Sequence, residues 1–144
     1  MELDTDHALS EKVIGLAMKV HRTLGPGFLE SVYRNALAFE LRRAGLPVEL
    51  DQHIKVRYEN VIVGDFIADL IVGDTLLCEL KAISSLSKAD EVQLVHYLNA
   101  TNRDVGLLLN FGASSLQFKR KHRRFTPDPS LVDLHNPVNP VNPV

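Results

Sequence analysis

The fold of this chain is decided by residues 68–81, which have the sequence ADLIVGDTLLCELK. Two apolar segments flank a Gly-Asp pair, a pattern that predicts two strands joined by a tight turn. Asp69, Glu79 and Lys81 stand among the apolar residues of these strands. Because charged side chains are costly to bury unless they are paired or bind a metal, the hairpin is predicted to carry a metal-dependent site.

The register of this hairpin decides whether its charged residues meet, because side chains alternate between the faces of a strand. A two-residue turn at Gly73-Asp74 would place Asp69 opposite Cys78 and divide the charged residues between the faces. A three-residue turn, 73–75, places Asp69 opposite Glu79. We predict the second register, because it gathers the carboxylates and leaves an apolar face that contains, on the first strand, Phe66, Ala68, Leu70 and Val72.

Two carboxylates opposite each other, with Cβ atoms roughly 5 Å apart, repel unless a cation lies between them. Oxygen ligands without a His or Cys cluster favour Mg²⁺ or Mn²⁺ over Zn²⁺. A neighbouring lysine can orient water and stabilise the charge that develops on a phosphate. The alternative is that Lys81 forms a simple ion pair with Glu79 or Asp69 at a sheet edge, and the spacing alone leaves both interpretations open.

Composition favours one domain with a hydrophobic core, since 45% of the 144 residues are apolar. The net charge of −2 argues against a broadly basic surface, so contact with nucleic acid needs a local patch. A single cysteine, Cys78, excludes an internal disulfide and fits a reducing compartment. With no signal-peptide pattern and no apolar run near the roughly 20 residues that span a bilayer, we expect a cytoplasmic protein without a membrane partner.

Hydrophobic periodicity predicts an α/β domain over residues 1–126. Its expected elements are helices at 8–24 and 28–44, strands at 48–58, 61–72 and 75–82, a helix at 88–100, a strand at 105–111 and a basic extended segment at 116–125. The three consecutive strands predict an antiparallel meander, and the crossover helix brings in a parallel neighbour, giving a mixed sheet flanked by helices. The Pro/Val/Asn-rich tail, 127–144, is expected to be disordered or extended.

Three motifs resemble those of one nuclease superfamily. Asp69 followed by Glu79-Leu80-Lys81 resembles the D…(D/E)-x-K signature of the PD-(D/E)xK nucleases, with Ala68 in place of the proline. Residues 27–33, GFLESVY, match the G-x-x-E-x-x-Y motif of the GxxExxY family within that superfamily. Residues 93–97, QLVHY, match the Q-x-x-x-Y motif of its exonuclease-like branch. The resemblance covers residues from about 9 to 124.

This resemblance implies a restriction-endonuclease-like core that hydrolyses phosphodiester bonds in nucleic acid with Mg²⁺ or Mn²⁺, and DNA is favoured over RNA. By motif position, Asp69 and Glu79 are metal ligands and Lys81 is the catalytic lysine. Glu30 is the helix-borne acid that joins them as a further ligand. Gln93 completes the catalytic set.

Four other residues are candidate substrate contacts, each with a structural alternative. Tyr33 lies three residues after Glu30 on one helix face, where it either reaches the site or belongs to the core. Tyr97 shares a helix face with Gln93 and either contacts substrate or packs against the sheet. Within the basic run KRKHRR at 119–124, Lys119 and Arg120 either contact phosphates or belong to a solvated strand whose charges point to both faces. Glu30 itself suits the first turn of a helix without any function.

Three functions therefore compete. The first is a metal-dependent nuclease, which the intact Asp69, Glu79 and Lys81 favour. The second is a nucleic-acid-binding module that does not cut or cuts only with a partner, which the small and weakly charged domain keeps open. The third is a protein-interaction adaptor on the same fold. A homodimer or another protein partner is compatible with each of these.

Overall fold

The computed structural model describes residues 2–123, with side chains from residue 6 onward, so the expected tail, 127–144, lies outside the described residues. Eight elements follow one another along the chain. They are α1 (Glu2–Leu24), α2 (Glu30–Arg43), β1 (Val48–Tyr58), β2 (Val61–Val72), β3 (Leu76–Lys81), α3 (Lys88–Thr101), β4 (Val105–Asn110) and β5 (Gln117–His122). Helix α1 starts earlier than the predicted residue 8, because the apolar stripe that signalled it begins only at Val13.

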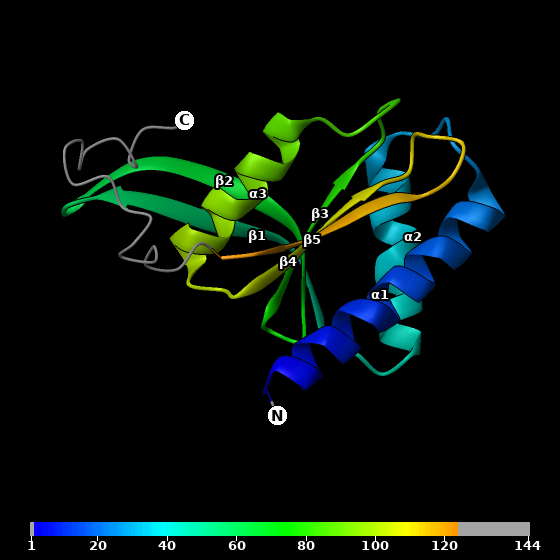
Figure 1. Cartoon of the computed structure of the whole chain (residues 1–144), viewed down its shortest axis with the longest axis horizontal. Helices are drawn as coiled ribbons and strands as arrows, with labels where there is room; N and C mark the ends of the chain where they lie inside the picture. Colours follow the sequence, from blue (N-terminus) through cyan, green and yellow to red (C-terminus); the bar gives the residue numbers. More distant parts are fainter. Residues whose placement is uncertain (1, 124–144) are drawn as a thin grey trace, which may run out of the picture.

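The five strands form one sheet in the order β1-β2-β3-β4-β5. Strands β1, β2 and β3 form the predicted antiparallel meander, and β4 pairs with β3 in parallel after the crossover through α3. Strand β5 pairs with β4 in the antiparallel direction. Helices α1 and α2 cover one face and α3 covers the other, while the β1–β2 hairpin extends beyond the helical layer (Figure 1). The predicted mixed sheet with flanking helices is confirmed.

Strands β3 and β4 form the centre of the sheet and are buried on both faces, which explains their nearly continuous apolar sequences. Leu76, Cys78 and Leu80 pack beneath α1 and α2. Leu77 faces α3 and packs against Leu94 there. Alternation along β3 then places Glu79 and Lys81 on the α3 face. None of the helices in the described residues is long and apolar enough to cross a membrane.

The hairpin between β2 and β3 has the predicted three-residue turn. Val72 pairs with Leu76 and Leu70 pairs with Cys78, so residues 73–75 form the turn. Gly73 has a φ of +60° and the residue after it has a φ of +66°, left-handed values that glycine and aspartate tolerate better than most residues. Continued by one residue on each strand, this register places Asp69 opposite Glu79.

The predicted apolar face of β2 is wrong in one respect. Leu70 and Val72 pack on the α1 and α2 side, but Ala68 and Phe66 pack on the α3 side. The exchange of faces occurs where Asp51 of β1 has a left-handed φ of +53°, although the β1–β2 pairing continues on either side. This residue interrupts the pleat, and strict alternation therefore fails there.

Asn110 at the end of β4 fixes the loop that follows β3. Its side chain is fully buried, and its Oδ1 accepts hydrogen bonds from the backbone N–H of Ile83 and of Gly112, both at 3.0 Å. Its Nδ2 donates to Ile83 O and to Gln117 Oε1, both at 2.9 Å. Gln117 Oε1 also accepts from Leu86 N at 3.0 Å. The loop between β3 and α3 is thus fastened to β4 and β5.

Gly112 provides a test of this close packing. A Cβ atom there would lie 2.4 Å from both N and O of Ile83, so Gly112→Ala is expected to destabilise the fold by about 3 kcal/mol. A Cβ at Gly15 in α1 would meet no atom within 4 Å, so the control Gly15→Ala is expected to stabilise by about 0.5–1 kcal/mol. Urea unfolding of both variants measures the difference, and equal stabilities would contradict the packing described.

Candidate active site

Asp69 of β2 and Glu79 of β3 hold each other in place through the backbone. The Asp69 Oδ2 atom accepts a hydrogen bond from Leu80 N at 2.7 Å. The backbone N–H of Asp69 in turn donates to Glu79 Oε2 at 3.3 Å. Each carboxylate is therefore bonded to the opposite strand, one step beyond the Leu70–Cys78 pair. The structure brings the two predicted acids together in the predicted register.

The environment of this pair disfavours two negative charges. Glu79 is buried, with 9% of its surface exposed. Loss of hydration, followed by the negative charge of Asp69, raises the pKa of Glu79 to about 8. Burial also raises the pKa of Asp69, against the opposing effect of its hydrogen bond from Leu80 N. A divalent cation would relieve the repulsion that these two groups otherwise carry.

Glu30 joins the pair from the other layer of the fold. It is the first residue of α2, and its side chain is exposed. Partial loss of hydration at its carboxylate raises its pKa, and the negative charge of Asp69 adds to this effect. The positive charges of Lys81 and Arg34 oppose the rise. Glu30 therefore lies within electrostatic reach of Asp69 and Lys81.

Lys81 is the last residue of β3, and its partner comes from α3. Its Nζ lies 3.9 Å from Asp90 Oδ1. Asp90 belongs to a capping box in which Ser87 N donates to Asp90 Oδ2 at 2.9 Å and Asp90 N donates to Ser87 Oγ at 3.2 Å. The simple pairing of Lys81 with Glu79 or Asp69 is thus not the ion pair that forms. Asp90 escaped the sequence analysis, although Ser-x-x-Asp before a helix is a recognisable capping pattern.

Gln93 and Tyr97 lie on the stripe of α3 that Asp90 begins, since residues three and seven positions apart share a helix face. Tyr97 stacks on Phe66, with ring centroids 3.4 Å apart and an interplanar angle of 17°. Burial raises the pKa of Tyr97, and the negative charges of Glu79 and Asp69 add to the rise. Tyr97 therefore lies within electrostatic reach of the acids, and the exposed Gln93 lies between it and Asp90 along α3.

Tyr33 does not reach the site, so its predicted contact with substrate is wrong. It is fully buried, and its ring stacks on Phe111 with centroids 4.8 Å apart. Its hydroxyl donates to Gly25 O at 2.5 Å and accepts from Phe28 N at 3.1 Å. Both hydrogen bonds fasten the turn that leads into α2. Tyr33 is a core residue that fixes where the helix carrying Glu30 begins.

The basic strand β5 points its charges to both faces, as predicted. Arg120 Nε donates to Ser10 Oγ at 2.9 Å, and its guanidinium also pairs with the Glu11 carboxylate of α1. The Arg120 guanidinium is thus bound to two residues of α1, which argues against its predicted substrate contact. Lys119 is exposed, and the next lysine pairs with Glu91 of α3 at 3.0 Å. Lys119 alone of the two predicted contacts is directed toward the α3 face.

The donor set fits a hydrated magnesium ion held by two carboxylates. Asp69 and Glu79 supply only oxygen, the ligand that Mg²⁺ prefers, and Mg²⁺ commonly keeps several waters when one or two carboxylates bind it. Within residues 6–123, however, no group of three His, Cys, Asp or Glu side chains is close enough to hold a metal. The expected role of Glu30 as a third ligand beside Asp69 and Glu79 therefore stays a prediction.

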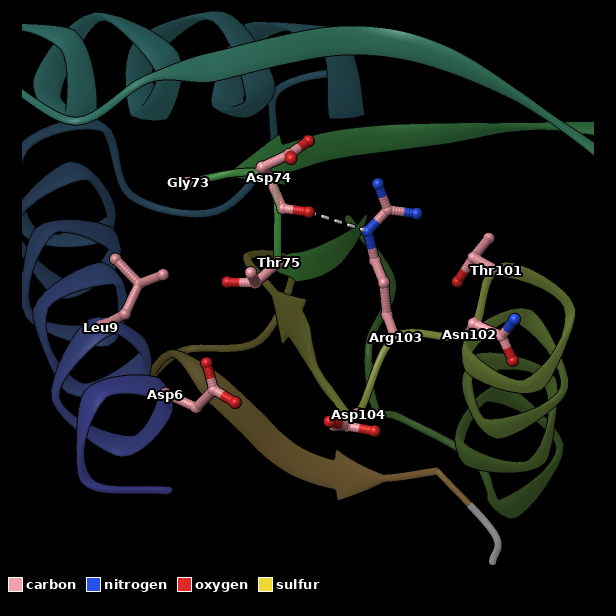
Figure 2. A pocket seen from close by; sticks show the side chains of 9 residues that line it. All are labelled: Asp6, Leu9, Gly73, Asp74, Thr75, Thr101, Asn102, Arg103 and Asp104. Atoms are coloured by element: carbon pink, nitrogen blue, oxygen red, sulfur yellow. Dashed lines mark hydrogen bonds between the residues drawn. The ribbon is translucent and has the colours of Figure 1, made fainter. Parts of the chain in front are cut away.

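A cavity at the other end of the central strands is separate from this site. Its volume is about 560 Å³. It is lined by the β2–β3 turn, the α3–β4 connection and α1, with Arg103 Nε donating to Asp74 O at 3.3 Å (Figure 2). These segments lie where β3 and β4 begin, whereas Lys81 lies where β3 ends. The cavity therefore does not contain the carboxylates.

A family model and a solved structure agree with this fold. A sequence model of the PD-(D/E)XK nuclease superfamily matches residues 7–125. A search of curated proteins finds no match. The solved structure titled "Crystal structure of SSO0001" has 17% sequence identity and a TM-score of 0.50, covering 67% of this chain and 50% of that chain. An alkaline exonuclease, LHK-Exo from Laribacter hongkongensis, has 17% identity and a TM-score of 0.47, covering 65% of this chain and 56% of that chain.

The chain thus spans about half the length of these two structures, and identity this low concerns the fold alone. Together with the superfamily match, the mixed five-stranded sheet with three helices confirms the predicted restriction-endonuclease-like α/β fold. The narrower GxxExxY assignment stays a prediction from residues 27–33.

The raised pKa of Glu79 predicts how stability depends on pH in the metal-free protein. The folded pKa is about 8 against an ordinary value of 4.5, so the folded state binds more protons than the unfolded state between these limits. The free energy of unfolding is therefore expected to fall as pH rises from about 5 to 8, by on the order of 1 kcal/mol per pH unit. Urea unfolding in EDTA across this range measures the slope.

Glu79→Gln keeps the size of the side chain but removes its titration, so its slope is expected to be much flatter. The control is Glu49→Gln, which replaces an exposed carboxylate of β1 and is expected to keep the wild-type slope. Equal slopes for wild type and Glu79→Gln would show that Glu79 does not carry this proton.

Proposed function

Because this chain belongs to the PD-(D/E)XK nuclease superfamily, we propose that it is a Mg²⁺-dependent nuclease-like phosphodiesterase that hydrolyses phosphodiester bonds in nucleic acid, with DNA favoured. The observation that carries the proposal is the meeting of Asp69 and Glu79 across β2 and β3, beside Lys81 at the end of β3. Two acids and a lysine at one place on a rigid sheet suit this chemistry.

Asp69 and Glu79 would hold the metal, with Mg²⁺ the first candidate and Mn²⁺ the second. A bound divalent ion would lower the pKa of a coordinated water and neutralise charge on the phosphate. The cation would also favour the ionised form of both acids, whose pKa values the metal-free protein raises, and the protein's part is to orient the two carboxylates. The hydrogen bonds from Leu80 N to Asp69 and from Asp69 N to Glu79 orient the carboxylates, because each fixes one carboxylate oxygen.

Lys81 is the group proposed to stabilise the charge that develops on the phosphate. Its charge reaches Glu30, Asp69 and Glu79, since it lowers the pKa of each. The weak 3.9 Å pair with Asp90 holds the ammonium near the acids without neutralising it fully. Glu30 is proposed to orient the attacking water as a hydrogen-bond acceptor from the α2 side.

Three more residues are proposed to contact the substrate. Gln93 projects from the exposed face of α3 next to Asp90, where its amide can bond phosphate or sugar. Phe66 covers one face of the Tyr97 ring, so the remaining surface of this half-buried side chain is what would meet the substrate. Lys119 supplies an exposed charge on β5 that suits a phosphate at longer range.

The second candidate is a nucleic-acid-binding module that cuts only with a partner. A net charge of −2 favours it, because affinity for nucleic acid rises with the number of phosphates that basic residues neutralise. Arg120 is bonded to α1, which reduces the basic surface further. A partner protein or a second copy of the chain would then supply the missing contacts.

A cleavage assay tests the proposal directly. The chain is incubated with end-labelled single-stranded DNA, double-stranded DNA and RNA in Mg²⁺, in Mn²⁺ and in EDTA. Lys81→Ala and Asp69→Asn are each expected to lower the cleavage rate by at least about 100-fold, because each removes a group that acts on the transition state. The control is Lys12→Ala, an exposed lysine of α1, and it is expected to cut like wild type.

Three outcomes separate the candidates. Cleavage that needs metal and is lost in Lys81→Ala supports the nuclease. Cleavage equal in Lys81→Ala and Lys12→Ala would overturn the assignment of the site. Binding without cleavage of any of the three substrates would move the proposal to the partner-dependent module.

A further inference from the structure

Three acids lie in one row across three neighbouring strands. The pairs Leu50–Leu70 and Gln52–Ala68 stand on either side of Asp51 and Asp69, so these two aspartates occupy opposite positions on β1 and β2. The β2–β3 register continues the row to Glu79. Asp51 was not among the residues that the motifs identified, and it carries the left-handed φ of +53°.

Arg34 reaches this row from α2. Its Nη1 lies 2.7 Å from Asp51 Oδ1, and its side chain is 23% exposed. It stands one helical turn after Glu30, so both side chains project from the same face of the helix. Its contacts with Asn35 Oδ1, from Nε and Nη2, are long at 3.4 Å. The guanidinium thus has one strong partner and lies at the surface of the site.

The positive charge of Arg34 acts on the acids of the site. It lowers the pKa of Asp69 and of Glu30, as Lys81 also does. Two cations therefore flank the carboxylates, with Lys81 at the end of β3 and Arg34 on α2. A guanidinium in such a position can meet phosphate oxygens with two parallel hydrogen bonds.

We propose that Arg34 is a substrate-binding residue that exchanges its ion pair with Asp51 for a phosphate group of the nucleic acid on the α2 side of the carboxylates. The inference rests on the proposed function and names a contact that the motifs do not contain. Asp51 is 51% exposed on its side chain, so water screens its ion pair with Arg34 and the pair is readily exchanged. In the free protein Asp51 keeps the guanidinium near its binding position, which lowers the entropy lost on binding.

The competing explanation is structural, with the Arg34–Asp51 pair fastening α2 to β1. The two explanations predict different effects of the substitutions on the affinity for nucleic acid. If the pair is only structural, removal of either partner has the same effect. If Asp51 competes with phosphate for Arg34, loss of Arg34 weakens binding and loss of Asp51 strengthens it. Asn tolerates a left-handed backbone, so Asp51→Asn removes the charge without straining β1.

The experiment measures the dissociation constant of a fluorescent single-stranded DNA by anisotropy in Mg²⁺, with all proteins in a Lys81→Ala background so that the strand is not cut. Arg34→Gln is expected to weaken binding by about 10-fold or more. It should also reduce the slope of log K against log salt by about 0.7. Asp51→Asn is expected to tighten binding about two- to five-fold. The control is Arg43→Gln on the same helix, where Arg43 is exposed and pairs with Glu40, and no change is expected.

Arg34→Lys is the second variant, which keeps the charge but loses the planar fork, and an intermediate loss is expected. Urea midpoints establish that each variant is folded. If Arg34→Gln and Asp51→Asn weaken binding alike, or if Arg34→Gln binds like Arg43→Gln, the inference is overturned while the proposed function stands. If the chain with Lys81 intact neither binds nor cuts any nucleic acid, the proposed function fails together with the inference.

Discussion

The site depends on one exchange of hydrogen bonds between β2 and β3. The regular ladder runs from the Val72–Leu76 pair to the Leu70–Cys78 pair. At the next step side chains replace it, because Leu80 N donates to Asp69 and Asp69 N donates to Glu79. A carboxylate that accepts a backbone N–H is oriented more firmly than one that only repels its neighbour. The same contacts that join the strands therefore aim the acids.

These hydrogen bonds between β2 and β3 depend on neighbouring elements that hold the end of β3 in place. Asn110, buried and fully bonded, fastens the loop after Lys81 to β4 and β5. That loop ends in the capping box of α3, which contributes Asp90 to Lys81. Gly112 leaves room for the loop, since no side chain larger than hydrogen fits there. The end of β3 that carries Lys81 is therefore held by contacts from β4, β5 and α3, which follow it in the sequence.

The sequence predicted the parts of the fold that follow from local patterns. The requirement that the carboxylates share one face and leave an apolar face predicted the three-residue turn, and that turn placed Asp69 opposite Glu79. The exchange of faces at Ala68 could not be predicted, because alternation assumes a regular pleat and nothing in the sequence marks the left-handed backbone of Asp51. The partner of Arg120 could not be predicted either. A positive charge suits a phosphate and the Glu11 carboxylate equally well, and the sequence does not show which of them lies nearby.

The motif from Gly27 to Tyr33 contains one residue that lies near the acids, Glu30, and one that belongs to the core, Tyr33. Tyr33 is buried against Phe111, and its hydroxyl holds the carbonyl of Gly25 and the N–H of Phe28. These bonds fix the turn whose end begins α2, and Glu30 is the first residue of that helix. The glycines permit the turn with φ values of +70° at Gly25 and +117° at Gly27. Of Glu30 and Tyr33, Glu30 is the one near the acids, and Tyr33 fixes the start of the helix that carries it. A substitution of Tyr33 would therefore act on the site by moving α2.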